Sequence, residues 1–226
     1  MRRYGAFGSV NAERIEIVFQ GSRGAADGWA WRDYRFKAAV DDVAARPPLL
    51  APWHYRLDWM RWIVACRGRA ASAAAAPWTL HLAGRLLAGG GDGDNGANVA
   101  ARLLARDGGD PFASANTASF GNSPPGYVRA ELYRYEFAEP GATIDDADDD
   151  DAADDSAAGG GGGGAPRRQR RVYWTRERVG SFLSPMSLRQ YLSEVAPMLE
   201  SRYGWLPPET PAVAALRSEE ARRRQE

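Results

Sequence analysis

The chain has 226 residues, 44% of them hydrophobic and 11% aromatic, a composition that indicates a globular domain and excludes a largely disordered chain. Its 29 basic and 29 acidic residues give a net charge of zero, which argues against broad electrostatic binding to nucleic acid or to an anionic membrane surface. The single cysteine, Cys66, excludes an internal disulfide and a multi-cysteine metal site.

Two stretches near the N-terminus have the alternating pattern of half-buried strands. In residues 13–21, ERIEIVFQG, apolar and polar side chains alternate. In residues 29–38, WAWRDYRFKA, Tyr34 and Phe36 alternate with charged residues. The two stretches predict an antiparallel hairpin or a neighbouring strand pair.

A helix is predicted for residues 57–66, LDWMRWIVAC, after a proline-rich connection. Trp59 and Trp62 fall on one apolar stripe, and Asp58 lies near the helix N-terminus, where the dipole favours a carboxylate. We interpret Trp59 and Trp62 as core residues. Together with Asp58 they form a structural motif that docks the helix onto the sheet.

The same stretch also allows a functional interpretation. Trp53, Tyr55 and Arg56 belong to residue types that are enriched at protein interfaces, so they are candidate contacts for a client or partner. Trp205 and Leu206 are candidates for extending that patch.

Two more helices follow. Residues 77–89, PWTLHLAGRLLAG, begin with a proline suited to a first helical turn and place Leu80, Ala83 and Leu87 on one face. A further helix is predicted near residues 98–107, NVAARLLARD.

The C-terminal half contains the clearest strand, residues 127–137, with Tyr133, Tyr135 and Phe137 at a period of two. Its predicted partner is the segment 171–183. Between them lie acidic, glycine and basic runs that cannot bury apolar surface, so we predict an elongated, disordered hairpin loop.

A helix is then predicted for residues 187–202, with Ser187 as a possible N-cap and a kink or interruption at Pro197. The residues after 211 are charged and helix-prone, and we expect them to be frayed.

These elements predict an α+β fold, an antiparallel sheet of about four or five strands with three or four helices packed on it. Residues 1–138 and 167–206 form one domain in this interpretation. Residues 139–166 are a disordered acidic and glycine-rich linker, and residues 207–226 are a charged tail.

No pattern of residues is arranged for catalysis. The sequence has no G-x-S-x-G turn, no phosphate-binding glycine loop and no EF-hand pattern, so we predict no catalytic residues, no cofactor and no metal. Two alternatives stay open. One is an enzyme that uses His54, Tyr55 and Asp58; the other is a carbohydrate or peptide binding module that uses exposed Tyr133 and Tyr135.

Four blocks resemble the C-terminal domain of the lipase maturation factor family. They are YGAFGSVNAERIEIVFQG (4–21), RPPLLAPWHYRLDWMRWIVA (46–65), PPGYVRAELYRYEFA (124–138) and VYWTRERVGSFLSPMSL (172–188). Their order and spacing match the family as well.

The resemblance implies a protein of the endoplasmic reticulum membrane, in which several spanning helices precede a large soluble domain. That domain helps secreted lipases to fold and assemble, an activity that is chaperone-like rather than enzymatic. The expected partners are therefore secreted lipase clients, without nucleic acid. The spanning region is absent and the chain begins almost directly at the first block, so it looks like a fragment, and contact with the membrane is expected only through that region.

Overall fold

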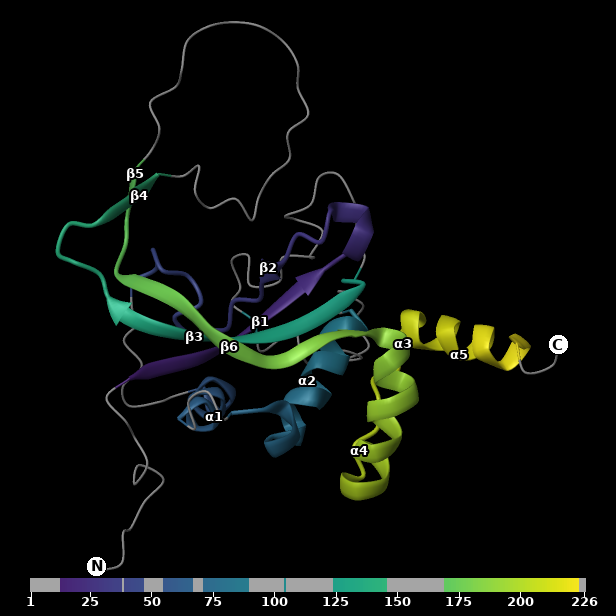
Figure 1. The fold of residues 1–226 in the computed structure, drawn as a ribbon. Coiled ribbons are helices and arrows are strands. Elements are labelled where there is room, and N and C mark those ends of the chain that lie inside the picture. The colour runs from purple at the N-terminus through teal and green to yellow at the C-terminus, as the bar shows by residue number, and fades with distance from the viewer. Residues whose placement is uncertain are drawn as a thin grey trace, which may run out of the picture.

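A four-stranded antiparallel sheet with the strand order β2-β1-β3-β6 forms the centre of the fold. The computed structural model describes residues 13–37, 39–46, 55–66, 71–89, 104, 124–145 and 169–223. A second, two-stranded sheet pairs β4 with β5. With helices packed on the sheet, the architecture is α+β, as predicted (Figure 1).

The two central strands pair in unbroken register. β1 (Arg14–Ser22) pairs with β3 (Tyr127–Phe137) over nine consecutive residue pairs, so each side chain of β1 shares a face with its partner on β3. One face carries Ile15, Ile17 and Phe19 from β1. The other face carries polar residues of the alternation such as Glu16 and Gln20. Both are buried, because further chain segments cover that face too.

The strand at the edge of the sheet, β6 (Trp174–Ser187), pairs with β3 as predicted. Its register shifts at three places along β3, which adds residues to β6 and twists the edge. At the other edge, β2 (Arg32–Asp33) is much shorter than its alternating pattern predicted.

The connection between β3 and β6 is an elongated hairpin, as predicted. Its base contains β4 (Thr143–Asp145) and β5 (Gln169–Arg171), which pair antiparallel. β4 lies inside the range 139–166 that was predicted to be a linker, so the ordered base of the hairpin extends into that range. Residues 146–168 lie outside the described residues.

Helices cover one face of the sheet (Figure 1). These include α1 (Arg56–Ala65) and α2 (Pro77–Leu87), and Pro77 lies in the first turn of α2 as predicted. Short 3-10 turns lie at Gly24–Asp27, between β1 and β2, and at Ala73–Ala75, directly before α2. The helix predicted near residues 98–107 lies mostly outside the described residues. Its one described residue, Leu104, is not helical and forms an isolated antiparallel bridge with Phe36. At this residue a tertiary contact outweighs the local helical pattern.

The C-terminal helical segment begins with α3 (Leu188–Gln190), where Ser187 and Gln190 form the capping box that completes the N-cap prediction. A π-helical turn (Tyr191–Val195) and α4 (Ala196–Tyr203) follow. The wider turn ends two residues before Pro197, which has no N–H to donate, and an interruption was predicted at this proline.

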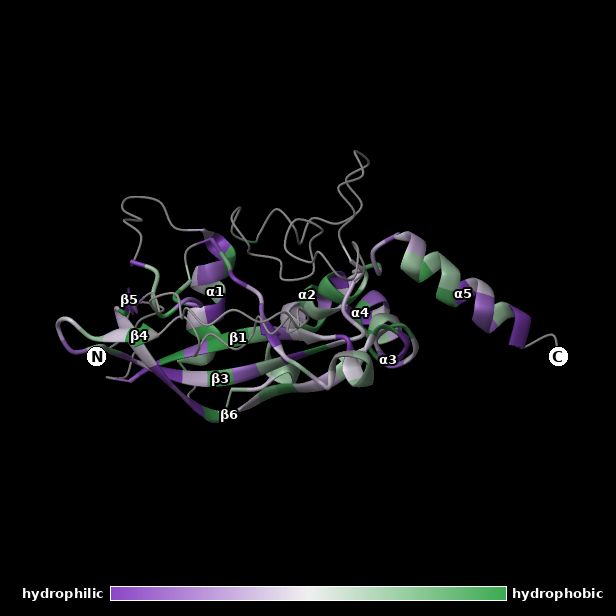
Figure 2. Cartoon of the chain, turned by 90° about the horizontal axis from the view of Figure 1, so that it is seen from above, coloured by the Kyte–Doolittle hydropathy of each residue, from purple (hydrophilic) through white to green (hydrophobic). Residues whose placement is uncertain are grey.

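The last helix, α5 (Pro211–Arg223), extends away from the rest of the described chain in both views, with a hydrophilic outer end (Figures 1 and 2). Val213 is buried at its start, and Arg189 of α3 forms ion pairs with Glu219 and Glu220. No helix in the described parts of the chain is both long enough and apolar enough to span a bilayer.

The main core lies between the sheet and the helices. It combines residues of β1 and β3 with residues of α2 and the C-terminal helices; the most buried include Ile17, Phe19, Val128, Ala130, Leu132, Ala83, Leu87, Tyr191 and Leu199. A smaller cluster of Val18, Val40, Tyr135 and Trp174 lies on the opposite face.

Candidate functional site

The start of α1 presents an exposed aromatic and basic surface. Tyr55, the N-cap residue, is 52% exposed, Trp59 is 41% exposed, and Arg56 is exposed between them. The Lys37 ammonium lies 5.4 Å from the centre of the Tyr55 ring, within range of a cation–π interaction. We refer to Tyr55, Arg56, Trp59 and Lys37 as the α1 surface.

Two of the three candidate partner contacts, Tyr55 and Arg56, therefore lie in the α1 surface. The third, Trp53, lies outside the described residues, as does His54 of the alternative catalytic interpretation. Asp58 lies in the first turn of α1, as predicted.

The prediction that Trp59 belongs to the core is wrong. The residues of α1 that are fully buried are Arg61 and Ala65, and Leu57 and Val64 pack against the core beside them. Because successive helical residues rotate by about 100°, Trp59 lies about 200° from Arg61 and points away from the sheet.

Trp62 is neither exposed nor fully buried, so the two tryptophans do not act as one core stripe. Of the three residues of the predicted motif, Trp59 is exposed, whereas Asp58 is half-buried and its carboxylate attracts the Arg61 guanidinium.

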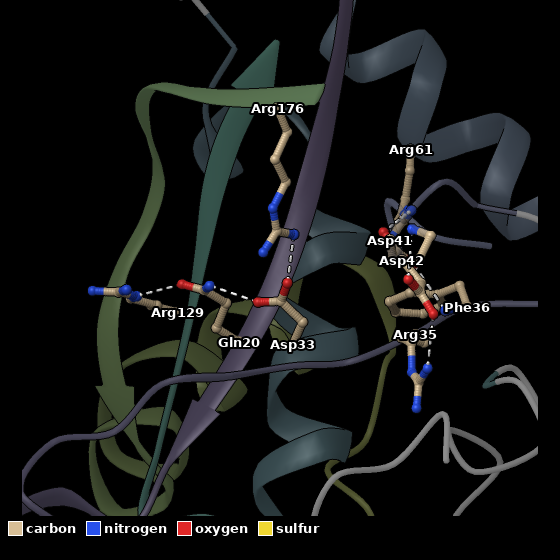
Figure 3. Close-up of polar contacts among 10 residues, drawn as sticks. Gln20, Asp33, Arg35, Phe36, Asp41, Asp42, Arg61, Arg129 and Arg176 are labelled. Carbon is tan, nitrogen blue, oxygen red and sulfur yellow. Dashed lines mark hydrogen bonds and ion pairs between the residues drawn. The ribbon is translucent and has the colours of Figure 1, made fainter. Parts of the chain in front are cut away.

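Arg61 lies on the core side of α1, where its charge and its Nη2 group find a partner, while its Nε and Nη1 groups make no hydrogen bond within the described residues. Its Nη2 donates to Asp41 Oδ1 over 3.0 Å, and its guanidinium lies 4.3 Å from the centre of the Phe36 ring (Figure 3). The Phe36 backbone N–H donates to the second oxygen, Asp41 Oδ2, over 2.9 Å. One buried carboxylate thus joins α1 to the backbone that follows β2.

Neighbouring carboxylates keep Arg61 charged. Burial lowers its pKa, but the attraction of Asp41 and of Glu16 outweighs burial, and the pKa of Arg61 lies above its ordinary value. The ion pair orients α1, and with it the exposed residues Tyr55, Arg56 and Trp59 on the opposite side.

The opposite face of the sheet carries a row of polar contacts. Arg129 Nε donates to Gln20 Oε1 (2.8 Å), Gln20 Nε2 donates to Asp33 Oδ1 (2.6 Å), and Arg176 Nη1 donates to Asp33 Oδ2 (2.5 Å) (Figure 3). Burial lowers the pKa of Arg176, but Asp33 and Tyr135 together outweigh burial, so that pKa is raised. These polar groups are paired within the fold and cross-link all four strands of the sheet, β1, β2, β3 and β6.

This arrangement counts against the carbohydrate or peptide binding interpretation. Tyr135 is only 3% exposed, and Tyr133 is half-buried with the Arg176 guanidinium 4.8 Å from the centre of its ring. Phe137 is exposed, but it stacks on Trp174 with ring centroids 4.4 Å apart, at the far end of β3.

His81 is the second histidine, and its surroundings hold it neutral. Arg85 Nε donates to His81 Nε2 over 3.0 Å, and Tyr191 Oη lies 3.5 Å from His81 Nδ1. Burial, and then the positive charge of Arg85, lowers the pKa of His81 from 6.5 to about 4. The imidazole links α2 to the π-helical turn, and neither nitrogen is held toward a Ser or Cys side chain by these contacts.

Trp205 and Leu206 belong to a different surface from Tyr55. Trp205 stacks on Tyr203 (4.8 Å between centroids) and packs against His81 of α2 (5.7 Å). α2 lies between α1 and α4 in both views (Figures 1 and 2). Within the described chain, no group of three His, Cys, Asp or Glu side chains is placed to hold a metal ion.

Sequence reasoning missed Arg61 and Asp41. The available signal was a charged residue inside the otherwise apolar run WMRWIVA, which identifies a side chain that needs a buried partner. Its partner lies 20 residues earlier in the chain, in a segment without a periodic pattern.

The sequence profile of the lipase maturation factor C-terminal domain matches residues 1–150. The chain is 36% identical over 205 residues to lipase maturation factor 1 of Homo sapiens, a match that covers 89% of this chain and 28% of the human protein. It is 32% identical over 128 residues to lipase maturation factor 2 of Rattus norvegicus, covering 57% of this chain and 15% of the rat protein. The chain thus spans between a quarter and a third of the length of the human relative. No solved structure matches it.

Proposed function

Because the chain belongs to the lipase maturation factor family, we propose that it is the part of a maturation factor that assists the folding and assembly of secreted lipases. The proposed place of action is the lumen of the endoplasmic reticulum, where secreted lipases fold. The observation that carries the proposal is the family match over most of the chain, and the activity of the whole-length relatives is extended to this domain as part of it.

The α1 surface is the proposed client contact. Tyr55 and Trp59 expose large aromatic areas, and Arg56 and Lys37 add charge beside them, a composition that resembles interface hot spots. A partly folded client exposes apolar side chains that such a surface can cover. The buried Arg61–Asp41 pair supports this role because it holds the orientation of α1.

The proposed action is chaperone-like and does not involve catalysis. Arg61 and Asp41 pair in the core, and Arg129, Gln20, Asp33 and Arg176 contact one another across the sheet. The neutral His81 has Arg85 and Tyr191 as neighbours rather than a nucleophile. Client binding therefore explains the exposed residues better than a reaction does.

The test is rescue of secreted lipase activity in cells that lack their own maturation factor. The full chain is directed into the endoplasmic reticulum by an added signal and membrane anchor, and lipase activity and lipase protein are both measured in the medium. We expect active lipase in the medium with the unaltered chain and a loss of at least severalfold with the double variant Tyr55→Ala, Arg56→Glu.

A matched control is available on α4. Tyr203 is 39% exposed and Arg202 is exposed beside it, so Tyr203→Ala, Arg202→Glu makes the same chemical change on another helix. Rescue should survive in this control. Equal loss in both variants would contradict a contact at α1, and failure of the folded, unaltered chain would contradict the proposal that this domain handles clients.

A further inference from the structure

Trp59 and Trp62 are separated by two residues, in the order Trp59-Met60-Arg61-Trp62. W-x-x-W is the acceptor pattern of C-mannosylation, in which the first tryptophan receives a hexose on its indole ring in the lumen of the endoplasmic reticulum. On a helix the same spacing also describes two residues of one core stripe, so the sequence alone does not distinguish these interpretations.

The exposure of Trp59 distinguishes the core stripe from the acceptor pattern. A core stripe requires Trp59 to be buried, yet it is 41% exposed on the side of α1 that faces away from Arg61. Tyr55, one turn earlier, is exposed as well, so a hexose on Trp59 would extend from a solvent-exposed side of the helix. The second tryptophan of the pattern, Trp62, is more deeply placed and is not the acceptor in this pattern.

We propose that Trp59 is a site of C-linked hexose modification, placed within the α1 surface. In the transfer, a bond forms between the anomeric carbon of the hexose and C2 of the indole. The bond from that carbon to the phosphate of a polyprenyl-phosphate hexose donor breaks, the polyprenyl phosphate leaves, and the C2 proton passes to a base of the transferase. No oxidation or reduction takes place.

The modification would change the polarity of the α1 surface. The modified indole keeps its N–H and gains the hydroxyls of the sugar, so the exposed side of α1 becomes more polar next to Tyr55 and Arg56. The site depends on the proposed function only in requiring that the chain be in the lumen of the endoplasmic reticulum.

The chain contains its own matched control. Trp29 is 46% exposed, a fraction similar to that of Trp59, but the residue three positions later is Arg32 rather than a tryptophan. If accessibility alone decided the modification, both tryptophans would be modified. If the pattern decides it, only Trp59 is modified.

The experiment expresses the full chain behind a secretory signal in animal cells, and in matched cells that lack the C-mannosyltransferase. A reporter with an established W-x-x-W acceptor is expressed beside it. Peptides that contain Trp59 and Trp29 are then sequenced by fragmentation mass spectrometry. We expect one added hexose on Trp59, resistant to enzymes that cleave N- and O-linked sugars, and none on Trp29.

The variant Trp62→Ala keeps the acceptor but removes the pattern, and the hexose on Trp59 should fall at least tenfold. The transferase-deficient cells should yield only unmodified Trp59. An unmodified Trp59 beside a modified reporter would overturn the proposal, as would equal modification of Trp29. Rescue of secreted lipase activity is measured in a separate assay. If the chain rescues lipase activity without a hexose on Trp59, the modification site is rejected and the proposed function is retained.

Discussion

Gly84 lets the ring of Tyr191 lie directly against the backbone of α2. A Cβ atom built on Gly84 would overlap the ring carbons of Tyr191, which is fully buried. The absence of a side chain at one position thus allows α2 to pack against the π-helical turn.

Gly84→Ala should therefore destabilise the protein by about 1–3 kcal/mol, although alanine favours a helix, because the added methyl group overpacks a filled site. The control is Gly180→Ala, whose new Cβ would meet Leu132 Cδ1 at an ordinary 3.7 Å. Urea unfolding of both variants measures the effect. Equal midpoints for Gly84→Ala and the unaltered chain would contradict the packing described here.

The ion pair between Arg61 and Asp41 is a second feature at the scale of single residues. Arg61→Met should cost about 3–5 kcal/mol, since it leaves the buried carboxylate of Asp41 without its charged partner. The double variant Arg61→Met, Asp41→Leu should lose less than the sum of the two single changes. A double-mutant cycle by urea unfolding measures this coupling, and strict additivity would show that the pair does not interact.

His81 should make stability depend on pH. Its pKa is 6.5 ordinarily and about 4 in the folded chain, so well above pH 6.5 it is neutral in both states and contributes no pH dependence. Between these values the unfolded chain binds the proton more readily, and stability falls as the pH falls. His81→Gln should remove this contribution, so the variant should lose less stability than the unaltered chain between pH 7 and pH 4.5. Parallel unfolding free energies over that range would refute the assignment.

At the scale of elements, the helices differ in which residues attach them to the sheet. α2 is attached by aliphatic side chains such as Leu82 and Leu86, whereas α1 is attached through Arg61 and Ala65 and turns a tryptophan outward. The large apolar residue of a helix is therefore not always the one that it buries.

The substitution Trp59→Ala tests the orientation of α1. Because Trp59 is 41% exposed, its loss should cost less than about 2 kcal/mol, below the 3–5 kcal/mol typical of a buried aromatic residue. Leu82→Ala, at a position that is 5% exposed, should cost about 2–5 kcal/mol in the same unfolding assay. A larger loss at Trp59 than at Leu82 would restore the core interpretation.

At the scale of the whole molecule, β3 and β6 are joined through a long hairpin whose described base is the β4–β5 pair. Replacing residues 147–166 by a short Gly-Ser turn should change the unfolding free energy by no more than about 1 kcal/mol, because their composition adds no core and loop-closure entropy changes slowly with length. Thermal and urea unfolding of the shortened chain check this. A large drop in stability would show that this segment packs on the domain.

Local periodicity predicted much of this architecture. The alternation in residues 13–21 and 127–137 identified the two central strands, and Pro77 and Ser187 identified two helix starts. The candidate contacts Tyr55 and Arg56 are exposed, and Trp59, which was assigned to the core, is exposed beside them.

By itself the sequence determined the two central strands, the main helices, the strand pairing across the long hairpin and the family, because each of these depends on patterns within a short stretch or on blocks of matching residues. Only the tertiary structure decided which side of α1 faces the sheet. Burial of Arg61 requires a carboxylate and an aromatic ring next to its guanidinium, and these groups come from Asp41 and Phe36, in another part of the chain. A pattern along one helix contains no information about those partners, and they are what leaves Tyr55, Arg56 and Trp59 exposed.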